Sequence, residues 1–279
     1  MSRSQLLRFG AVVAWLGILL ALDTQVDSRE QLVLGLLTWI ALWLACRRVP
    51  SELRAQAFVV VVVATCAEIV GSLVWGVYTY RLENLPSFVP PAHGLVYLAG
   101  AGLAGAANNR LLQGWLVRAA LVLVLVWGIA GVSVLPRSDV GGALGAALLA
   151  FYLLRGRAPE IYAGVFLVVA WLELYGTALG TWRWAAEIPG TSVSLGNPPS
   201  GVASGYVWFD IVALAVTPRL LALARTVPQG LRLRQGEADP VLGLGSSDRE
   251  LADRAERHDQ LLRPFGAMRS QRDEAEARL

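Results

Sequence analysis

Apolar residues along the chain are gathered into eight runs, separated by short polar segments. The runs cover residues 7–22, 32–46, 56–80, 92–107, 119–135, 140–154, 161–181 and 202–224. A membrane-spanning helix needs about 20 predominantly apolar residues, and several runs are shorter, so we expect flanking residues to extend them. The pattern predicts an all-α fold, a polytopic membrane bundle of about eight transmembrane helices.

The distribution of arginine predicts how this bundle lies in the bilayer. Arginines concentrate before the first run and after every second run: Arg3, Arg8, Arg47, Arg48, Arg54, Arg110, Arg118, Arg155, Arg157, Arg219 and Arg225. The intervening loops carry one arginine each, together with acidic residues. Because arginine-rich loops stay in the cytoplasm, both termini are predicted to be cytoplasmic. We expect a multi-pass protein of the cell (plasma) membrane, in contact with the lipid bilayer.

Composition supports this class and narrows the function. Hydrophobic residues make up 55% of the 279 residues and charged residues 16%, which is unusually apolar for a soluble domain. The basic residues are spread along the chain as topology determinants and form no single patch, so no nucleic-acid partner is expected. The sequence has two histidines and no HExxH, Walker or dinucleotide-binding motif, so it predicts neither a cofactor nor a histidine-rich metal centre.

Beyond residue 225 the composition becomes polar and rich in charge. Residues 226–279 include the stretch SSDRELADRAERHDQLLRPF, in which Ser247 and Glu250 have the spacing of a helical capping box. The segment is predicted to be a partly helical cytoplasmic tail. It is either a solvated surface without a specific role or a docking element for a protein partner.

Two segments of the chain resemble each other when Glu68 is aligned with Glu173. The first reads EIVGSLVWGVYTYRLENLPSFVPPAHGLVYL and the second reads ELYGTALGTWRWAAEIPGTSVSLGNPPSGVASGYVWFD. Both contain E-x-x-G, an aromatic-rich stretch, a Pro-Pro step, and then a glycine and an aromatic residue. The likeness predicts two parallel four-helix membrane repeats, residues 1–112 and 113–225, followed by the tail.

Ionisable residues within the apolar runs are the candidates for chemistry: Glu68, Glu173, Asp210 and His93. Such residues are costly inside a membrane and usually face a protein interior or a water-filled cavity. The repeat predicts that they converge in the outer half of the bundle. A carboxyl group withdrawn from water favours its neutral form, which suits a proton donor. The alternative is that the acids only join neighbouring helices through hydrogen bonds.

Aromatic residues accompany these acids along the sequence. The candidates for the walls of a substrate site are Trp75, Tyr78, Tyr80, Tyr97, Trp182, Trp184, Tyr206, Trp208 and Phe209. Trp75 and Tyr78 follow Glu68 at helical spacing, which predicts that the three share one helix face. The alternative is an interfacial belt, because tryptophan and tyrosine gather at membrane–water boundaries.

The two repeated segments resemble a family of bacterial and archaeal membrane proteins of carotenoid biosynthesis that includes the carotenoid hydratases. The residues that carry the resemblance are Glu68, Gly71, Gly76, Tyr78, Tyr80, Val89, Pro90, Gly180, Trp182, Trp184, Val193 and Asn197. The resemblance covers about 60 of the 279 residues. Val74 and Trp75 stand where the family motif has Pro-Phe, and Pro198 follows Asn197 where the family has an aromatic residue.

The resemblance implies hydration of a carbon–carbon double bond in an isoprenoid. Glu68 or Glu173 would protonate the alkene, and Asp210 or the other glutamate would orient the attacking water, with His93 as a further catalytic candidate. Asn197 would join the aromatic residues in binding the hydrophobic substrate, and aromatic faces would stabilise the carbocation.

Two other functions fit the same sequence. A transporter or flippase would use parallel repeats with acids near their shared axis for alternating access. A structural or assembly subunit of a membrane complex would use residues 226–279 for docking.

Overall fold

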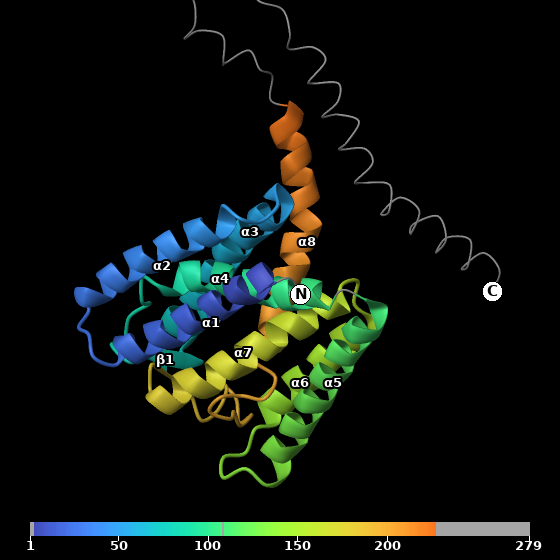
Figure 1. The fold of residues 1–279 in the computed structure, drawn as a ribbon. Coiled ribbons are helices and arrows are strands. Elements are labelled where there is room, and N and C mark those ends of the chain that lie inside the picture. The colour runs from blue at the N-terminus through green and yellow to red at the C-terminus, as the bar shows by residue number, and fades with distance from the viewer. Residues whose placement is uncertain (1–2, 108, 227–279) are drawn as a thin grey trace, which may run out of the picture. The chain divides into compact units, whose positions relative to one another are not determined.

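The computed structural model describes residues 3–107 and 109–226, and these residues are mostly helical (Figure 1). The α-helices in this part of the chain are α1 (Arg3–Asp23), α2 (Glu30–Cys46), α3 (Ser51–Glu68), α4 (Val89–Ala106), α5 (Arg110–Ser133), α6 (Val140–Arg155), α7 (Pro159–Leu179) and α8 (Ala203–Thr226). A π-helical segment, η1 (Ile69–Trp75), continues α3. The predicted helical fold is confirmed, and the predicted tail over 226–279 lies almost wholly outside the described residues.

Four helices are long and apolar enough to cross a membrane, judged by length and composition: Ser51–Trp75, Arg110–Ser133, Pro159–Leu179 and Ala203–Leu223. Three apolar helical stretches in the described part of the chain are shorter: Phe9–Asp23 within α1, Glu30–Cys46 and Val140–Arg155. At 1.5 Å per residue, a 17-residue helix such as α2 measures about 26 Å, less than the roughly 30 Å hydrocarbon core. The described part of the chain therefore has four candidate spans of full length, fewer than the eight predicted from the apolar runs.

The helices of the two halves of the chain pack across each other. The most extensive helix contact joins α4 to α7, and α3 packs in a similar way against α8 (Figure 1). Within the halves, α3 packs on α4 as α7 packs on α8, and α2 packs on α4 as α6 packs on α8. The first helix of each half packs differently: α1 contacts α4 and α7 in addition to its neighbour α2, whereas α5 packs mainly on its neighbour α6 and also contacts α7.

A small two-stranded sheet joins the halves at one end of the bundle. Strands β1 (Tyr78–Tyr80) and β2 (Trp182–Trp184) pair antiparallel, with Tyr78 opposite Trp184 and Tyr80 opposite Trp182. The apolar runs had predicted helix through residues 80 and 181, and this prediction is wrong. Gly76 and Gly180 have φ values of 73° and 75°, so each takes the left-handed conformation that ends a helix.

The π-helical segment explains a difference of one residue between the two halves. Eight positions separate Glu68 from Gly76, whereas seven separate Glu173 from Gly180. A π-helical turn accommodates one extra residue without ending the helix. The segment η1 lies within this longer interval, so both glutamates are followed by a glycine cap and a strand despite the insertion.

Glycines allow the central contact between α4 and α7 to be close. A Cβ atom built on Gly100 would lie 2.6 Å from the backbone Cα and N of Val165, and one built on Gly164 would meet the carbonyl oxygen of Gly100. Backbone atoms of a packed helix cannot move aside as the end of a flexible side chain can.

We therefore expect Gly100→Ala to separate α4 from α7 and to lower the free energy of unfolding by about 1–3 kcal/mol, the usual cost of overpacking. The measurement is thermal unfolding of the purified protein in detergent. Gly114→Ala in α5 is the matched control, because a Cβ atom there meets nothing within 4 Å. A Gly100→Ala protein as stable as the Gly114→Ala protein would contradict this account of the contact.

Candidate functional site

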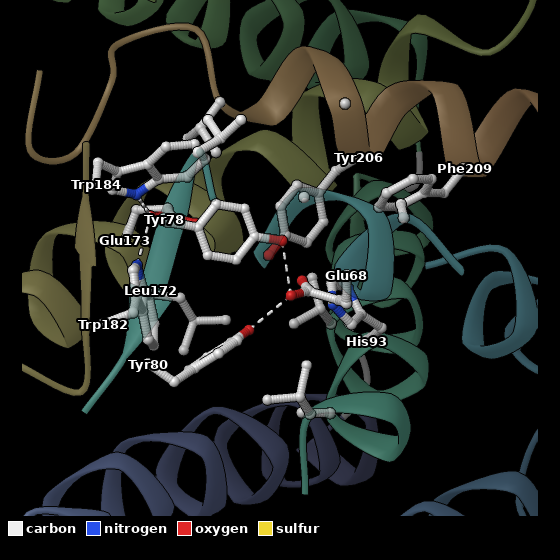
Figure 2. A pocket seen from close by; sticks show the side chains of 18 of the residues that line it. Glu68, Tyr78, Tyr80, His93, Leu172, Glu173, Trp182, Trp184, Tyr206 and Phe209 are labelled. Carbon is white, nitrogen blue, oxygen red and sulfur yellow. Dashed lines mark hydrogen bonds and ion pairs between the residues drawn. The ribbon is translucent and has the colours of Figure 1, made fainter. Parts of the chain in front are cut away.

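A cavity of about 250 Å³ lies between the small sheet and helices α1, α3, α4, α7 and α8 (Figure 2). Its lining includes both aligned glutamates, Glu68 and Glu173, and the histidine His93. All three side chains are buried, with exposed fractions of 8%, 4% and 5%. Leucines of α1 and aromatic side chains form most of the remaining wall. The structure thus places two carboxyl groups and an imidazole in one largely apolar chamber.

Glu68 is held by three hydrogen-bonding groups. The hydroxyls of Tyr78 and Tyr80 donate to its Oε2 at 2.7 and 2.8 Å, and the Nε2 atom of His93 lies 2.9 Å from its Oε1. Glu68 ends α3, the tyrosines project from β1, and His93 lies one turn into α4, so three elements meet at this carboxyl group (Figure 2). With both tyrosines donating, the arrangement suits an ionised carboxylate beside a histidine that can carry positive charge.

Glu173 also accepts two hydrogen bonds on one oxygen, but from indole N–H groups instead of hydroxyls. The indole N–H groups of Trp182 and Trp184 donate to its Oε2 at 3.0 and 3.1 Å. An indole N–H is a donor only, and it is neutral at every accessible pH. Both indoles bind the same oxygen, which leaves Oε1 of Glu173 as the position where a proton can be carried.

The register of the sheet sets this arrangement. Successive side chains of a strand point to opposite faces, so Tyr78 and Tyr80 share a face, as do Trp182 and Trp184. The rings of Tyr78 and Trp184 are 4.7 Å apart and those of Tyr80 and Trp182 are 6.2 Å apart, measured between centroids. The donors to Glu68 therefore pack directly against the donors to Glu173, which joins the two carboxyl groups through a contiguous aromatic cluster (Figure 2).

His93 has a second nitrogen that faces the interior. Its Nδ1 atom is buried and has no hydrogen-bond partner among the described residues. The imidazole packs on the rings of Tyr206 and Phe209 from α8, at centroid distances of 5.2 and 6.0 Å. These contacts hold the ring in place while Nε2 faces Glu68, so the histidine is fixed with one nitrogen in use.

The cavity gathers most of the residues that the sequence suggested, and the others lie elsewhere. The lining contains Glu68, Trp75, Tyr78, Tyr80, His93, Glu173, Trp182, Trp184, Tyr206 and Phe209. Trp75 is 52% exposed at its edge, and its indole N–H donates to the carbonyl oxygen of Pro189 at 3.3 Å.

Four candidates lie outside this lining. Asp210 is buried in α8, and its Oδ2 has no hydrogen-bond partner among the described residues. Tyr97 donates to Oε1 of Gln56 at 2.9 Å, deeper in the bundle. Trp208 is 51% exposed. Asn197 supports β2 from outside, because its Oδ1 accepts the backbone N–H of Trp184 at 2.9 Å.

Asp139 is a structural anchor that the sequence reasoning missed. Its Oδ1 accepts the backbone N–H groups of Gly142 and Gly196, at 3.0 and 2.6 Å. Its Oδ2 accepts the backbone N–H and the hydroxyl of Ser200, both at 2.7 Å. The carboxylate thus caps α6 and also fastens the loop that leads into α8. An acid directly before an apolar run is a helix-capping signal, and that signal could have identified the first role.

Two arginines outside the helices fasten the ends of the sheet to neighbouring loops. Arg81, next to β1, donates to the backbone carbonyls of Asp23, the last residue of α1, and of Val26 in the α1–α2 connection. Arg137, in the α5–α6 connection, donates to the backbone carbonyls of Trp184 and Ala185 at the end of β2. Each half of the chain therefore ties its first loop to the sheet by one guanidinium group.

The described residues contain no group of three or more His, Cys, Asp or Glu side chains that could hold a metal ion. No family model, curated protein or solved structure matches this chain.

Removal of the Asp139 carboxylate is expected to release the loop before α8. Asp139→Ala would leave the buried donors of Gly142, Gly196 and Ser200 without an acceptor, at a cost of about 3 kcal/mol or more. Ser138→Ala is the matched control, because that hydroxyl makes only an exposed contact with Ser194. Limited proteolysis within residues 190–202 and thermal unfolding would report the change, and equal behaviour of the two variants would refute the anchoring role.

Burial, and then the neighbouring Glu68, raise the pKa values of Tyr78 and Tyr80 well above the ordinary value. A raised pKa keeps a tyrosine in its neutral, donating form, so neither hydroxyl should ionise near pH 10, where exposed tyrosine does. We expect the native protein and the Tyr78→Phe/Tyr80→Phe variant to show the same alkaline tyrosinate absorbance up to about pH 11. If the alkaline absorbance change of the variant were smaller than that of the native protein by the amount that two tyrosines contribute, these two hydroxyls would titrate normally and the prediction would be wrong.

Proposed function

We propose that this chain is an integral membrane enzyme that protonates a hydrophobic isoprenoid, carotenoid or related lipid alkene and adds water to it, as a hydratase does. The observation that supports it most is that one largely apolar cavity, walled by aromatic side chains, is lined by both Glu68 and Glu173. Hydration of an alkene needs a proton donor, a site that tolerates a carbocation, and a base for the proton that water releases. The cavity contains a side chain suited to each need.

The proposed architecture is a bundle of about eight helices that cross the plasma membrane as two parallel four-helix repeats, residues 1–112 and 113–225, with cytoplasmic termini. The matching contacts of α4 with α7 and of α3 with α8 support a duplication, since each pair is the counterpart of the other. The glycine caps and paired strands that follow Glu68 and Glu173 support it further. The arginine distribution supports the orientation.

Glu173 is the proposed general acid. Its Oε2 is held by two neutral indoles, no cation among the described residues bonds to it, and Oε1 is left to carry a proton in a side chain that lines the cavity. Glu68 has the opposite surroundings, with two hydroxyl donors and the imidazole of His93. Glu68 is therefore proposed to stay ionised and to act with His93 as the base.

The reaction balances with these groups alone. The Oε1–H bond of Glu173 breaks as a new C–H bond forms at the less substituted alkene carbon, which leaves a tertiary carbocation and a carboxylate. A water molecule then forms the C–O bond, and its surplus proton passes to His93 or Glu68. Return of that proton to Glu173 restores the starting state, so the net change is the addition of one water.

The aromatic wall suits the cationic intermediate. Faces of tyrosine and tryptophan attract a positive charge within about 6 Å of the ring centroid, and the attraction is larger where water is excluded. Tyr78, Trp184 and Tyr206 are all in the cavity lining. Leu16, Leu19 and Leu20 of α1 complete an apolar wall that suits the hydrocarbon part of the substrate.

A proton-coupled transporter is the second candidate, supported by the buried pair of Glu68 and His93 at 2.9 Å. Such a pair can take up and release a proton as its surroundings change. The enzyme predicts a chemically altered alkene, whereas the transporter predicts movement of an unaltered solute. The third hypothesis, docking through residues 226–279, concerns a segment outside the described residues.

The test of the enzyme is mass spectrometry of pigments and lipids from a host that makes acyclic isoprenoids, with and without this chain. The expected result is a new product that is heavier by one water. Glu173→Gln and Glu68→Gln should each lower its yield by about 100-fold or more, the usual contribution of a general acid or base. Glu187→Gln, at an exposed carboxylate outside the cavity, should leave the yield unchanged.

Two outcomes would reject this function. An unchanged pigment and lipid profile in the producing host would rule out the proposed reaction on an isoprenoid. Proton-dependent solute flux in proteoliposomes that is lost on Glu68→Gln, with no altered product, would favour the transporter instead.

A further inference from the structure

A second cavity of about 560 Å³ lies between α1, α2 and α4, on a different face of α4 from the first. Its lining is almost wholly apolar, with Phe9 and Trp15 from α1 and Leu44 from α2. None of these residues belongs to the lining of the first cavity. The second cavity is therefore separate from the site of the proposed hydration.

Two glycines of α4 create this hollow. Leu95, Leu98, Gly102 and Gly105 follow one another at helical spacing along the lining, and the two leucines are buried. The glycines are exposed, and a Cβ atom at either position would meet nothing within 4 Å. Leucine side chains fill the α4 surface at one end of the hollow. Beside the exposed glycines the surface is open, and there the hollow reaches the outside of the bundle as a groove.

The groove has a positively charged end. Arg48, in the turn between α2 and α3, is exposed and belongs to its lining. The turn is held by Arg54, whose Nε donates to the carbonyl oxygen of Cys46 at 2.9 Å. Arg47 lies beside Arg48 in the sequence, with its guanidinium 4.7 Å from the ring centroid of Trp43. Arg48 therefore gives one end of an otherwise apolar groove a positive charge, and Arg47 and Arg54 lie close to it in the sequence.

We infer that this groove binds an anionic phospholipid, with the phosphate against Arg48 and one acyl chain along α4. Basic pockets at the cytoplasmic ends of membrane helices bind anionic headgroups. The interval from Leu95 to Gly105 measures about 15 Å along the helix axis, which gives room for most of an acyl chain. Charge selects the anionic lipid over a neutral one. The inference does not rest on the reaction proposed for the first cavity.

The test is native mass spectrometry of the full chain in detergent, titrated with dioleoyl-phosphatidylglycerol or with dioleoyl-phosphatidylcholine. The native protein should retain one phosphatidylglycerol more tightly than phosphatidylcholine. Gly102→Leu fills the groove and should weaken phosphatidylglycerol binding about ten-fold, which corresponds to two buried methylene groups. Arg48→Gln should weaken it about five-fold and abolish the preference over phosphatidylcholine.

Gly114→Leu in α5 is the matched control, because a Cβ atom there also meets nothing within 4 Å and Gly114 is not in the groove lining. It should bind phosphatidylglycerol as the native chain does. Arg48→Gln replaces an exposed residue on a different element, so it tests the role of charge independently of Gly102→Leu.

Three results would overturn the inference. Equal retention of the two lipids by the native chain would show that charge does not select the bound lipid. Equal retention by the native, Gly102→Leu and Gly114→Leu proteins would show that the lipid lies elsewhere on the surface. A dimer that dissociates on Gly102→Leu would identify a second copy of the chain as the occupant.

Discussion

The antiparallel pairing of β1 with β2 is the interaction on which the candidate site depends. Each strand contains only three residues, but the register places two tyrosines opposite two tryptophans. Without that pairing, Glu68 would lose its hydroxyl donors and Glu173 its indole donors. The strands come from opposite halves of the chain, so the site is completed only when the halves are joined.

Two buried carboxyl groups close to one another are costly, and the fold offsets that cost with hydrogen bonds. An ionised carboxylate taken out of water without partners would be strongly destabilising. Glu68 receives three polar contacts and Glu173 receives two. The glycine caps at Gly76 and Gly180 are needed for the same purpose, because they turn the chain from helix to strand just where the donors must reach back.

The sequence predicted the content of the site better than its geometry. Aligning Glu68 with Glu173 identified both acids, and the aromatic residues that carry the family resemblance included Tyr78, Tyr80, Trp182 and Trp184, which donate to them. The sheet was missed because a three-residue strand within an apolar run has too few alternating positions to be distinguished from helix. Trp75 and Tyr78 fall at helical spacing from Glu68, so periodicity favoured a continuous helix, whereas the positive φ of Gly76 ends it between them.

The sequence also failed to predict the roles of Asp210 and Asp139, because both depend on contacts between segments that are far apart in the chain. Asp210 was grouped with the glutamates because it is a third acid in an apolar run, but the rotation of α8 about its axis decides which residues face the cavity. Tyr206 and Phe209 do so, and Asp210 is buried elsewhere. The additional roles of Asp139 depend on Gly196 and Ser200, more than fifty positions away, which local pattern does not reveal.

The two halves share a scaffold and differ in the donors that they place on it, and this difference gives a direction to the proposed chemistry. An imidazole can both give and accept a proton, whereas an indole N–H only donates a hydrogen bond. Glu68 can therefore exchange a proton with His93, while its two tyrosines only donate hydrogen bonds to it. Glu173, held by two indoles, can pass a proton only to what occupies the cavity. A symmetric fold with these two sets of donors thus separates the acid from the base, which an addition of water across a double bond requires.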